Sequence, residues 1–301
     1  MRVGVTGSSG FIGSALVAAL HERGDNVVRF VRPDSPHASG DVIRWDPAKG
    51  LVDEGDLRRN GGFDAVVNLA GVGIAEGRWS IAQKDAILRS RTDATTLLAS
   101  VLEESTGTAY LANGSAIGIY GSRGDESLDE TSSVGDDFLA RVCVEWESAT
   151  SSLSEAGTSV AHVRTGIVMS RWGGALKKQL PLFRFGLGGP LGDGRQWISP
   201  ISLRDEVRSI VWLIDTQSSG PFNLVAPSAL TNRAFSDVLA RHLHRPGRLR
   251  VPRSALHLVL GPELADATAL ASQRVTPRNL QESGFIFESP DMASILSSAL
   301  A

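Results

Sequence analysis

Residues 6–13 read T-G-S-S-G-F-I-G, and they set the class of fold. A short apolar run, residues 1–6, precedes them and favours a buried strand. Residues 14–23 place apolar side chains on one face at helical spacing, and Gly24 supplies a helix stop. The sequence therefore predicts a strand, a glycine turn and a helix, which together open an α/β unit.

The three glycines of this turn have separate physical roles. Gly7 permits the tight turn, Gly10 lets the backbone approach a diphosphate, and Gly13 lets helix and strand pack closely. The helix N-terminus adds free N–H groups and a partial positive charge. We expect a dinucleotide at this turn, with Phe11 and Ile12 also in contact with it. The alternative is a structural glycine turn in an α/β protein of another kind.

The end of the second predicted strand, residues 26–31, indicates which dinucleotide is bound. An acidic residue about 20 positions beyond the turn would bind the ribose 2′-hydroxyl of NAD. Here Arg32 occupies that position, and a guanidinium pairs with a 2′-phosphate and stacks on adenine. Asp34 follows a proline, and we expect it to point elsewhere. We therefore predict NADP(H) as the cofactor; the alternative for Arg32 is a solvated turn residue.

The first half of the chain alternates strand and helix patterns. Residues 64–70 are mostly apolar, as in a strand buried on both faces. Further strands are expected at residues 26–31, within residues 109–120 and at residues 160–169, and long helices at residues 84–104 and 136–156. Alternation of this kind implies a parallel sheet with right-handed crossovers. We expect an α/β fold with a doubly wound, Rossmann-like sheet.

The second half predicts a smaller lobe that is intertwined with the sheet. Residues 173–200 are rich in Gly and Pro and favour loops around one short helix. Helices are expected at residues 203–215, which Ser202 caps, and at residues 232–244, with a strand at residues 221–225. We predict a dinucleotide-binding domain at residues 1–170, to which residues 201–226 return. A substrate lobe then comprises residues 171–200 and 227–301.

Composition excludes several classes of function. The chain has 301 residues, with 30 basic and 33 acidic side chains and a net charge of −3, which argues against a dedicated nucleic-acid binder. The single cysteine, Cys143, excludes an intramolecular disulfide and a Cys-rich zinc site. His242 and His244 point apart on a helix, so we expect no metal. No apolar run approaches a membrane span, and no secretory signal is visible. We therefore expect a cytoplasmic protein with no membrane partner.

Several motifs together carry a family resemblance. They include the glycine turn, residues 68–71 (NLAG), residues 115–121 (SAIGIYG), residues 186–192 (GLGGPLG) and residues 194–197 (GRQW). With these motifs the chain resembles the epimerase-family branch of the NAD(P)-dependent epimerase/dehydratases, within the extended short-chain dehydrogenase/reductases. The resemblance spans the whole chain. It implies a Rossmann-like fold, an NAD(P) cofactor and a small C-terminal domain at about residues 250–298.

The resemblance also implies cofactor contacts and an assembly. The backbone of Leu69, Ala70 and Gly71 would pass along the adenosine side of the dinucleotide. Thr165 and Gly166 would leave the sheet beside the nicotinamide. A homodimer through the helices at residues 84–104 and 136–156 is a further expectation.

The usual proton-transfer pair of this superfamily is missing. Its members use Tyr-x-x-x-Lys and a serine, in which the lysine lowers the tyrosine pKa and holds the nicotinamide ribose. Tyr110 and Tyr120 are each followed four positions later by glycine. Leu139 and Cys143 stand about where the pair would align. Hydride transfer supported by that pair is therefore not expected.

Ser115 and Tyr120 are the remaining catalytic candidates. Ser115 ends a predicted strand, at the edge where open sheets bind their ligands, and would orient the substrate. Tyr120 lies five residues further on and would act as a proton donor; its alternative role is packing in the turn that follows.

Two arginines are candidate ligand-binding residues. Arg91, on the helix after NLAG, would reach the diphosphate or ribose of the cofactor, and a surface salt bridge is the alternative. Arg195, in the glycine-rich segment at residues 186–197, would clamp a phosphate or carboxylate of the substrate, and a purely structural loop is the alternative.

Two functions are consistent with these patterns. The first is an NADP(H)-dependent oxidoreductase or epimerase/dehydratase that acts on a small polar substrate, such as a nucleotide sugar. The second is a non-catalytic NADP(H)-binding sensor. The glycine turn favours both equally. The missing tyrosine and lysine favour the sensor, whereas Ser115 and the loop at residues 186–197 favour the enzyme, which we prefer.

Overall fold

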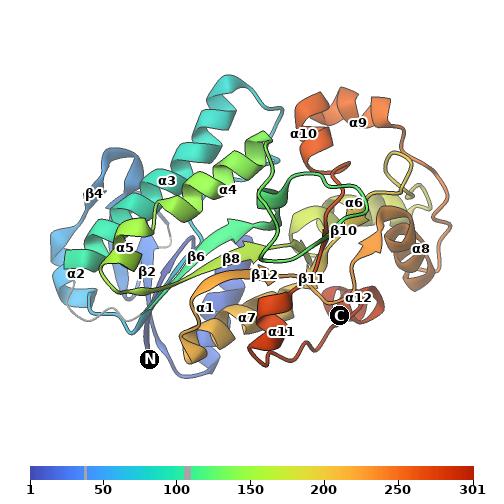
Figure 1. The fold of residues 1–301 in the computed structure, drawn as a ribbon. Coiled ribbons are helices and arrows are strands. Elements are labelled where there is room, and N and C mark those ends of the chain that lie inside the picture. Colours follow the sequence, from blue (N-terminus) through green and yellow to red (C-terminus); the bar gives the residue numbers. More distant parts are fainter. Residues whose placement is uncertain (37–38, 105–109) are drawn as a thin grey trace.

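The computed structural model describes residues 1–36, 39–104 and 110–301. Its main sheet has eight strands in the order β12-β8-β6-β5-β1-β2-β3-β4 (Figure 1). The strands are β1 (Arg2–Thr6), β2 (Asn26–Val31), β3 (Val42–Asp46), β4 (Leu51–Val52), β5 (Ala65–Asn68), β6 (Tyr110–Ala116), β8 (Ser159–Thr165) and β12 (Gly220–Leu224). All neighbours run parallel except β3 and β4. The chain starts in the middle and builds outward in both directions, so the predicted doubly wound, Rossmann-like sheet is confirmed.

Helices cover both faces of this sheet (Figure 1). One face carries α1 (Phe11–Glu22) and α7 (Leu203–Thr216); the other carries α3 (Ile81–Glu104), α4 (Phe138–Ser148) and α5 (Ser151–Glu155), with α2 (Glu54–Asn60) beside β3. Successive strand residues face opposite sides, so Val3 and Val5 pack toward α1 and α7, whereas Gly4 lies against Phe30 and Val66 on the other side. Double coverage is why both faces of the strands carry buried apolar side chains.

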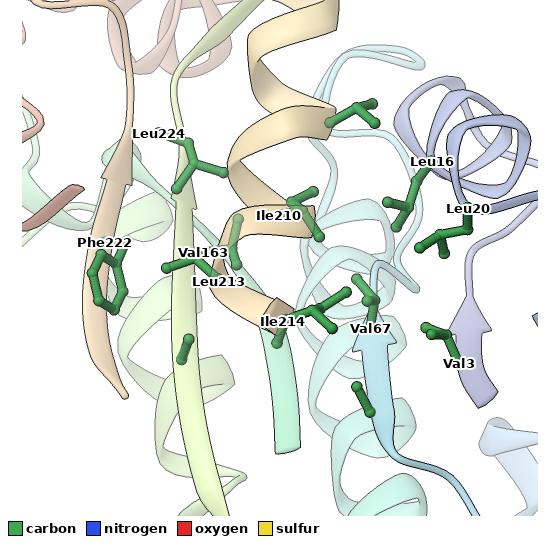
Figure 2. Close-up of a cluster of buried hydrophobic side chains, with 14 of the residues drawn as sticks. Val3, Leu16, Leu20, Val67, Val163, Ile210, Leu213, Ile214, Phe222 and Leu224 are labelled. Atoms are coloured by element: carbon green, nitrogen blue, oxygen red, sulfur yellow. The ribbon is translucent and has the colours of Figure 1, made fainter. Parts of the chain in front are cut away.

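Apolar side chains of the strands meet those of helices α1 and α7 in one buried cluster (Figure 2). Leu16 and Leu20 of α1 and Ile210, Leu213 and Ile214 of α7 are all 0% exposed. Each such side chain contributes about 1.5–3 kcal/mol to folding. This packing fixes the N-terminal ends of both helices at the same edge of the sheet.

A smaller lobe follows the sheet along the chain. Its elements are α6 (Gly174–Arg184), β10 (Trp197–Ile198), β13 (Leu230–Thr231), α8 (Asn232–His242), α9 (Arg253–Leu260), α10 (Pro262–Ala267) and α12 (Met292–Leu300). Its core joins α6, α8 and α12 through buried residues such as Leu176, Phe183, Phe235 and Ile295. The exact domain boundaries given above stay a prediction.

Pairs of short strands connect the main sheet region with the smaller lobe. β9 (Ile167–Met169) pairs with β11 (Pro200–Ser202), and β14 (Arg274–Val275) pairs with β7 (Ser127–Leu128). α11 (Arg278–Glu282) packs on β12. The C-terminal region therefore returns to the loops beyond β6, which include the 3₁₀ turn η2 (Ile117–Tyr120).

Several boundaries differ from the sequence-based expectations; for example, the strand expected at residues 160–169 is two strands, β8 and β9, and two other differences have a clear local cause. The helix expected at residues 136–156 is two helices, because Thr150 turns its hydroxyl back to the carbonyl of Glu147 at 2.8 Å and leaves the helical path. The first helix begins at Phe11, earlier than expected, because Gly10 already has the extended backbone of an N-cap. Ala109, the first residue of the stretch expected to include a strand, lies outside the described residues.

Candidate cofactor and active site

Two glycines of the turn between β1 and α1 have no room for a side chain. A Cβ on Gly7 would lie 2.4 Å from the carbonyl oxygen of Leu69, and one on Gly13 would lie 2.2 Å from that of Gly7. Gly7 also has a φ of 61°, which favours glycine. The turn, called the glycine cradle below, thus brings Gly7 close to the backbone of Leu69 and Gly13 close to the backbone of Gly7.

The N-terminus of α1 is left open to a ligand. Gly10 has no side chain with which to cap the helix, and the first turn carries no acidic residue. Its N–H groups and its dipole therefore favour a bound anion. The cradle and the open helix end fit the diphosphate of a dinucleotide, and this is the observation on which the cofactor assignment rests.

Phe11 ties this turn to the smaller lobe. A Cβ on Gly173 would lie 2.3 Å from Cδ2 of the Phe11 ring, and a Cβ on Gly174 would lie 3.7 Å from its Cε1. A hollow lined by Ser9, Gly10, Phe11 and Trp172, among others, lies alongside. The side chain of Phe11 therefore packs against the start of α6, and Ile12 follows in the same helical turn.

A row of polar side chains positions the second loop of the site. Thr6, Asn68 and Asn113 stand in register on neighbouring strands, on the face covered by α3 and α4. The Thr6 hydroxyl donates to Asn68 Oδ1 at 2.7 Å and accepts from the backbone N–H groups of Leu69 and Ala70 at 3.0 and 3.1 Å. The loop 69–71 is thereby held beside the glycine turn.

Arg32 lies where the sequence placed it, directly after β2 and so beside the end of β1. Its side chain is exposed and forms no hydrogen bond or ion pair with another described residue. A free guanidinium at this edge is available to a phosphate on the adenosine side.

Ser115 and Tyr120 belong to a buried network instead of an open crevice. The Ser115 hydroxyl donates to Glu147 Oε1 at 2.7 Å. The Tyr120 hydroxyl donates to Asn223 Oδ1 at 2.8 Å and accepts from Arg164 Nη1 at 3.0 Å. Tyr120 is 0% exposed and Ser115 is 4% exposed. This placement does not favour Tyr120 as a proton donor to a substrate, and it makes Ser115 a partner of Glu147.

Glu147 and Arg164 form the centre of this network and were not among the predicted site residues. The Arg164 guanidinium donates to both carboxylate oxygens of Glu147, at 2.8 and 2.9 Å. Burial alone would raise the pKa of Glu147, but the hydrogen bonds and charge of Arg164 outweigh it and lower that pKa. Burial raises the pKa of Tyr120, so the phenol stays neutral. Glu147 lies on α4 and Arg164 on β8, 17 positions apart, and no local spacing in the sequence indicated that they pair.

The positions of the missing pair are apolar in the structure as well. Leu139 and Cys143 lie one turn apart on α4, and both approach a Cβ placed on Gly118 of η2, at 3.5 and 3.9 Å. Burial raises the pKa of Cys143 to about 12, so this side chain is a neutral thiol at physiological pH. Neither position supplies an acid or a cation.

Thr165 and Gly166 lie at the end of β8. The Thr165 hydroxyl donates to Glu206 of α7 at 2.7 Å, on the face opposite Glu147. A Cβ on Gly166 would lie 2.6 Å from the Ser199 carbonyl oxygen and from Val225. Burial raises the pKa of Glu206 to about 8, although the bond from Thr165 acts against this.

Arg195 projects from the glycine-rich loop of the smaller lobe. Its backbone N–H donates to Asp193 Oδ1 at 3.0 Å, while its exposed guanidinium has no hydrogen bond or ion pair to a described residue. The neighbouring Trp197 is fixed by a bond to Asp125 at 2.8 Å and by Arg274, which stacks 4.4 Å from its ring centroid. The loop is thus anchored beside a free cation.

No group of three or more His, Cys, Asp and Glu side chains within the described residues is arranged to hold a metal ion. None of the helices in this part of the chain is long and apolar enough to cross a membrane.

The fold and the glycine cradle define a Rossmann-like protein of the dinucleotide-binding type. A model described as "NAD dependent epimerase/dehydratase family" matches residues 3–224, and one described as "Domain of unknown function (DUF1731)" matches residues 251–299. The chain belongs to the NAD dependent epimerase/dehydratase family. The predicted family and its small C-terminal domain are confirmed.

Named relatives agree with this assignment. The epimerase family protein Mb2239 of Mycobacterium bovis is 43% identical over 286 residues, covering 95% of this chain and 93% of the relative. A crystal structure of human epimerase family protein SDR39U1 with NADPH matches at a TM-score of 0.88 and 31% identity, covering 99% of both chains. A nucleoside-diphosphate sugar epimerase of Corynebacterium glutamicum matches at 0.78 and 36%, covering 100% of this chain and 58% of that one.

Proposed function

We propose that this protein binds NADP(H) at the glycine turn and acts on a small polar substrate as an oxidoreductase or an epimerase/dehydratase. The observation that carries the proposal is the glycine turn, where Gly7 and Gly13 bring backbone segments close together and the N-terminus of α1 has neither a capping side chain nor an acidic residue in its first turn. The presence of NADPH in the human SDR39U1 structure supports the same cofactor here. When bound, the nicotinamide would supply or accept a hydride.

The residues proposed to hold the cofactor surround this cradle. Backbone groups of Gly7, Gly10, Phe11, Ile12 and Gly13 would bind the diphosphate. The loop formed by Leu69, Ala70 and Gly71 would lie along the adenosine half, and the segment Thr165–Gly166 would lie beside the nicotinamide. Arg32 would pair with the 2′-phosphate and so select NADP(H) over NAD(H).

Arg195 is the proposed substrate-binding residue. Its free guanidinium has five donors in a planar fork that matches a phosphate or carboxylate. A nucleotide sugar carries such groups, and the C. glutamicum structure is described as a nucleoside-diphosphate sugar epimerase. Substitution of Arg195 would therefore raise KM for an anionic substrate without changing NADPH affinity.

An enzyme of this kind needs a group that transfers a proton to or from the substrate, whereas a protein that only binds NADP(H) does not. Ser115 already donates to Glu147, Tyr120 is buried, and Leu139 and Cys143 bring no acid. These observations favour a second candidate function, in which the protein binds NADP(H) without turning over a substrate. In that case Glu147 and Arg164 would only support the sheet edge.

The decisive experiment has two stages. Isothermal calorimetry first compares NADPH with NADH, and we expect NADPH to bind more tightly. NADPH absorbance is then followed across a panel of carbonyl compounds, and nucleotide sugars are analysed for isomerised product because a redox-neutral reaction consumes no NADPH. Turnover that Ser115→Ala abolishes would support the enzyme. Binding without turnover of any candidate would favour the sensor, and no heat with either reduced cofactor would contradict both.

A further inference from the structure

Two segments of the smaller lobe carry a strong local excess of positive charge. Residues 177–187 (KKQLPLFRFGL) and residues 241–250 (RHLHRPGRLR) contain seven Lys and Arg side chains and neither Asp nor Glu. The whole chain, in contrast, has a net charge of −3. The proposed cofactor site uses none of these cations, so their concentration here needs another explanation.

The two segments lie side by side in the structure. Arg245 Nε donates to the carbonyl oxygen of Arg184 at 3.0 Å, across 61 positions of the chain. A Cβ on Gly186 would lie 3.2 Å from Cγ of Pro246. The first segment belongs to α6 and the turn after it, and the second begins at the end of α8. Both helices lie at the end of the molecule opposite β4 (Figure 1).

Large apolar side chains project from the same surface. Phe185 is 81% exposed and Leu187 is 55% exposed, and Leu182 and Leu249 are exposed as well. The N–H of Leu187 donates to the carbonyl oxygen of Leu182 at 2.8 Å, which holds these two residues together after α6. Phe183 between them points inward and is 2% exposed. The turn is thus anchored by one phenylalanine while it presents another to solvent.

The cations around these side chains have no acidic partners. None of the seven forms an ion pair with a described residue, and those that donate hydrogen bonds do so to backbone carbonyl oxygens, as Arg245 does to Arg184. All seven are exposed. We call the four exposed apolar side chains and these cations the basic apolar patch; its cations are Lys177, Lys178, Arg184, Arg241, Arg245, Arg248 and Arg250.

This composition favours one kind of partner over the others. A second copy of the chain would place like charges opposite one another at a two-fold contact, which is unfavourable. A nucleic-acid strand would need several aromatic rings on which bases stack, whereas Phe185 is the exposed aromatic ring of these two segments. Apolar side chains flanked by Arg and Lys are suited to the boundary between lipid headgroups and acyl chains, where the cations meet anionic headgroups.

We propose that the basic apolar patch docks this protein on a membrane surface that contains anionic lipids, with Phe185 and Leu187 inserted among the headgroups. Docking of this kind needs no spanning helix, and it replaces the expectation of no membrane partner, which rested on the lack of an apolar run long enough to span a bilayer. The inference goes beyond the proposed function and does not depend on the cofactor. Because Leu187 and Arg195 belong to the same glycine-rich segment, docking would turn the substrate lobe toward the bilayer.

Co-sedimentation with lipid vesicles tests the proposal. Vesicles of phosphatidylcholine alone are compared with vesicles that contain about one third phosphatidylglycerol, and we expect at least about tenfold stronger binding to the anionic vesicles. Raising the salt concentration from about 0.1 M to about 0.5 M should weaken that binding, because the screening length becomes shorter than the distance from cation to headgroup.

Two double variants separate the apolar and the charged contributions. Phe185→Ser with Leu187→Ser should weaken binding to the anionic vesicles at least about tenfold, because the inserted apolar area is lost. Arg184→Glu with Arg248→Glu should weaken it by a similar factor, because attraction becomes repulsion. Leu51→Ser and Arg58→Glu are the matched controls, since Leu51 is 59% exposed on β4 and Arg58 is exposed on α2. Circular dichroism verifies that each variant is folded, and if a double variant does not fold, the headgroup and salt dependence of the wild type decides.

Several results would overturn the proposal. They are the absence of wild-type protein from the vesicle pellet, equal binding to neutral and anionic vesicles, and binding that neither folded double variant reduces more than its controls do. Retention on a heparin column without vesicle binding would also overturn it, because that result would assign the patch to a soluble polyanion or an acidic protein.

Discussion

At Gly13, the addition of a single methyl group is expected to change both stability and NADPH binding. A Cβ there would lie 2.2 Å from the backbone oxygen of Gly7, so the turn or the helix must shift. We expect Gly13→Ala to lower the free energy of unfolding by about 1–3 kcal/mol and to weaken NADPH binding by at least about tenfold. Urea denaturation and calorimetry measure the two effects. Gly55→Ala, in helix α2, is the control, because its Cβ would meet only side-chain atoms, with the Asp53 carboxylate at 3.2 Å, and the site is distant from the turn.

Arg32 decides between the two dinucleotides in our interpretation. In Arg32→Ala we expect the Kd for NADPH to rise about tenfold to a hundredfold, because the phosphate loses a charge-assisted partner, while the Kd for NADH stays the same. Arg58→Ala removes an exposed arginine elsewhere and should change neither. Equal effects on the two cofactors would show that Arg32 does not read the 2′-phosphate.

The sequence could predict those site residues whose position depends only on their neighbours along the chain. The glycines of the turn and Arg32 depend on their immediate neighbours along the chain, and the structure places them at one edge of the sheet. The partners of Ser115 and Tyr120 come from α4, β8 and β12, up to 103 positions away. Because that pairing depends on strand register and helix packing, the sequence indicated a serine at a strand end but not its bond to Glu147.

At the level of elements, α7 carries an unusual buried acid. Glu206 has a folded-state pKa of about 8 against an ordinary value of 4.5, because α7 buries it against the sheet and one of its oxygens has no partner in the described structure. Between these two pH values the folded protein retains a proton that the unfolded chain has lost. Stability therefore falls as pH rises from about 4.5 to about 8, and the full penalty remains above pH 8.

Removing this acid should flatten the pH dependence. We expect Glu206→Gln to raise the free energy of unfolding by about 2–4 kcal/mol more at alkaline pH than near pH 5. Urea denaturation of both proteins at the two pH values measures the difference. The exposed Glu145→Gln is the control; a difference equally large there, or absent for Glu206, would contradict the assignment.

Elements with strong local signals were predicted well. The helix capped by Ser202 begins at Leu203 as expected, because the serine hydroxyl accepts the N–H of Asp205 at 2.9 Å. The break between α4 and α5 was missed, since the apolar pattern continues through it and only the Thr150 bond interrupts the helix. Short strands such as β7 and β14 were also missed, because two-residue pairings have no periodicity to detect.

For the whole molecule, the expected homodimer depends on the outer faces of α3 and α4. Stable dimers bury an apolar centre. Among the described residues of these helices, Ile81 is the exposed large apolar side chain, and the other exposed positions are charged, polar or alanine. We therefore expect a monomer at micromolar concentration, measured by light scattering coupled to size exclusion. A measured mass of two chains would contradict this expectation. If Arg89→Glu or Ile81→Ser then reduced the mass to one chain, the dimer through α3 would be supported.

The return of the chain to β7 has a consequence for biosynthesis. Gln273 donates its amide to the carbonyl oxygens of Ile117 and Gly121 at 3.1 and 3.2 Å, so the 3₁₀ turn beside Cys143 is completed by residues near the C-terminus. A nascent polypeptide emerging from the ribosome displays its glycine turn early but lacks this closing contact until translation is nearly finished. A chain that is terminated early would thus contain the glycine turn but lack the contact of Gln273 with residues 117–121. We expect cellular proteases to degrade such an incompletely folded product.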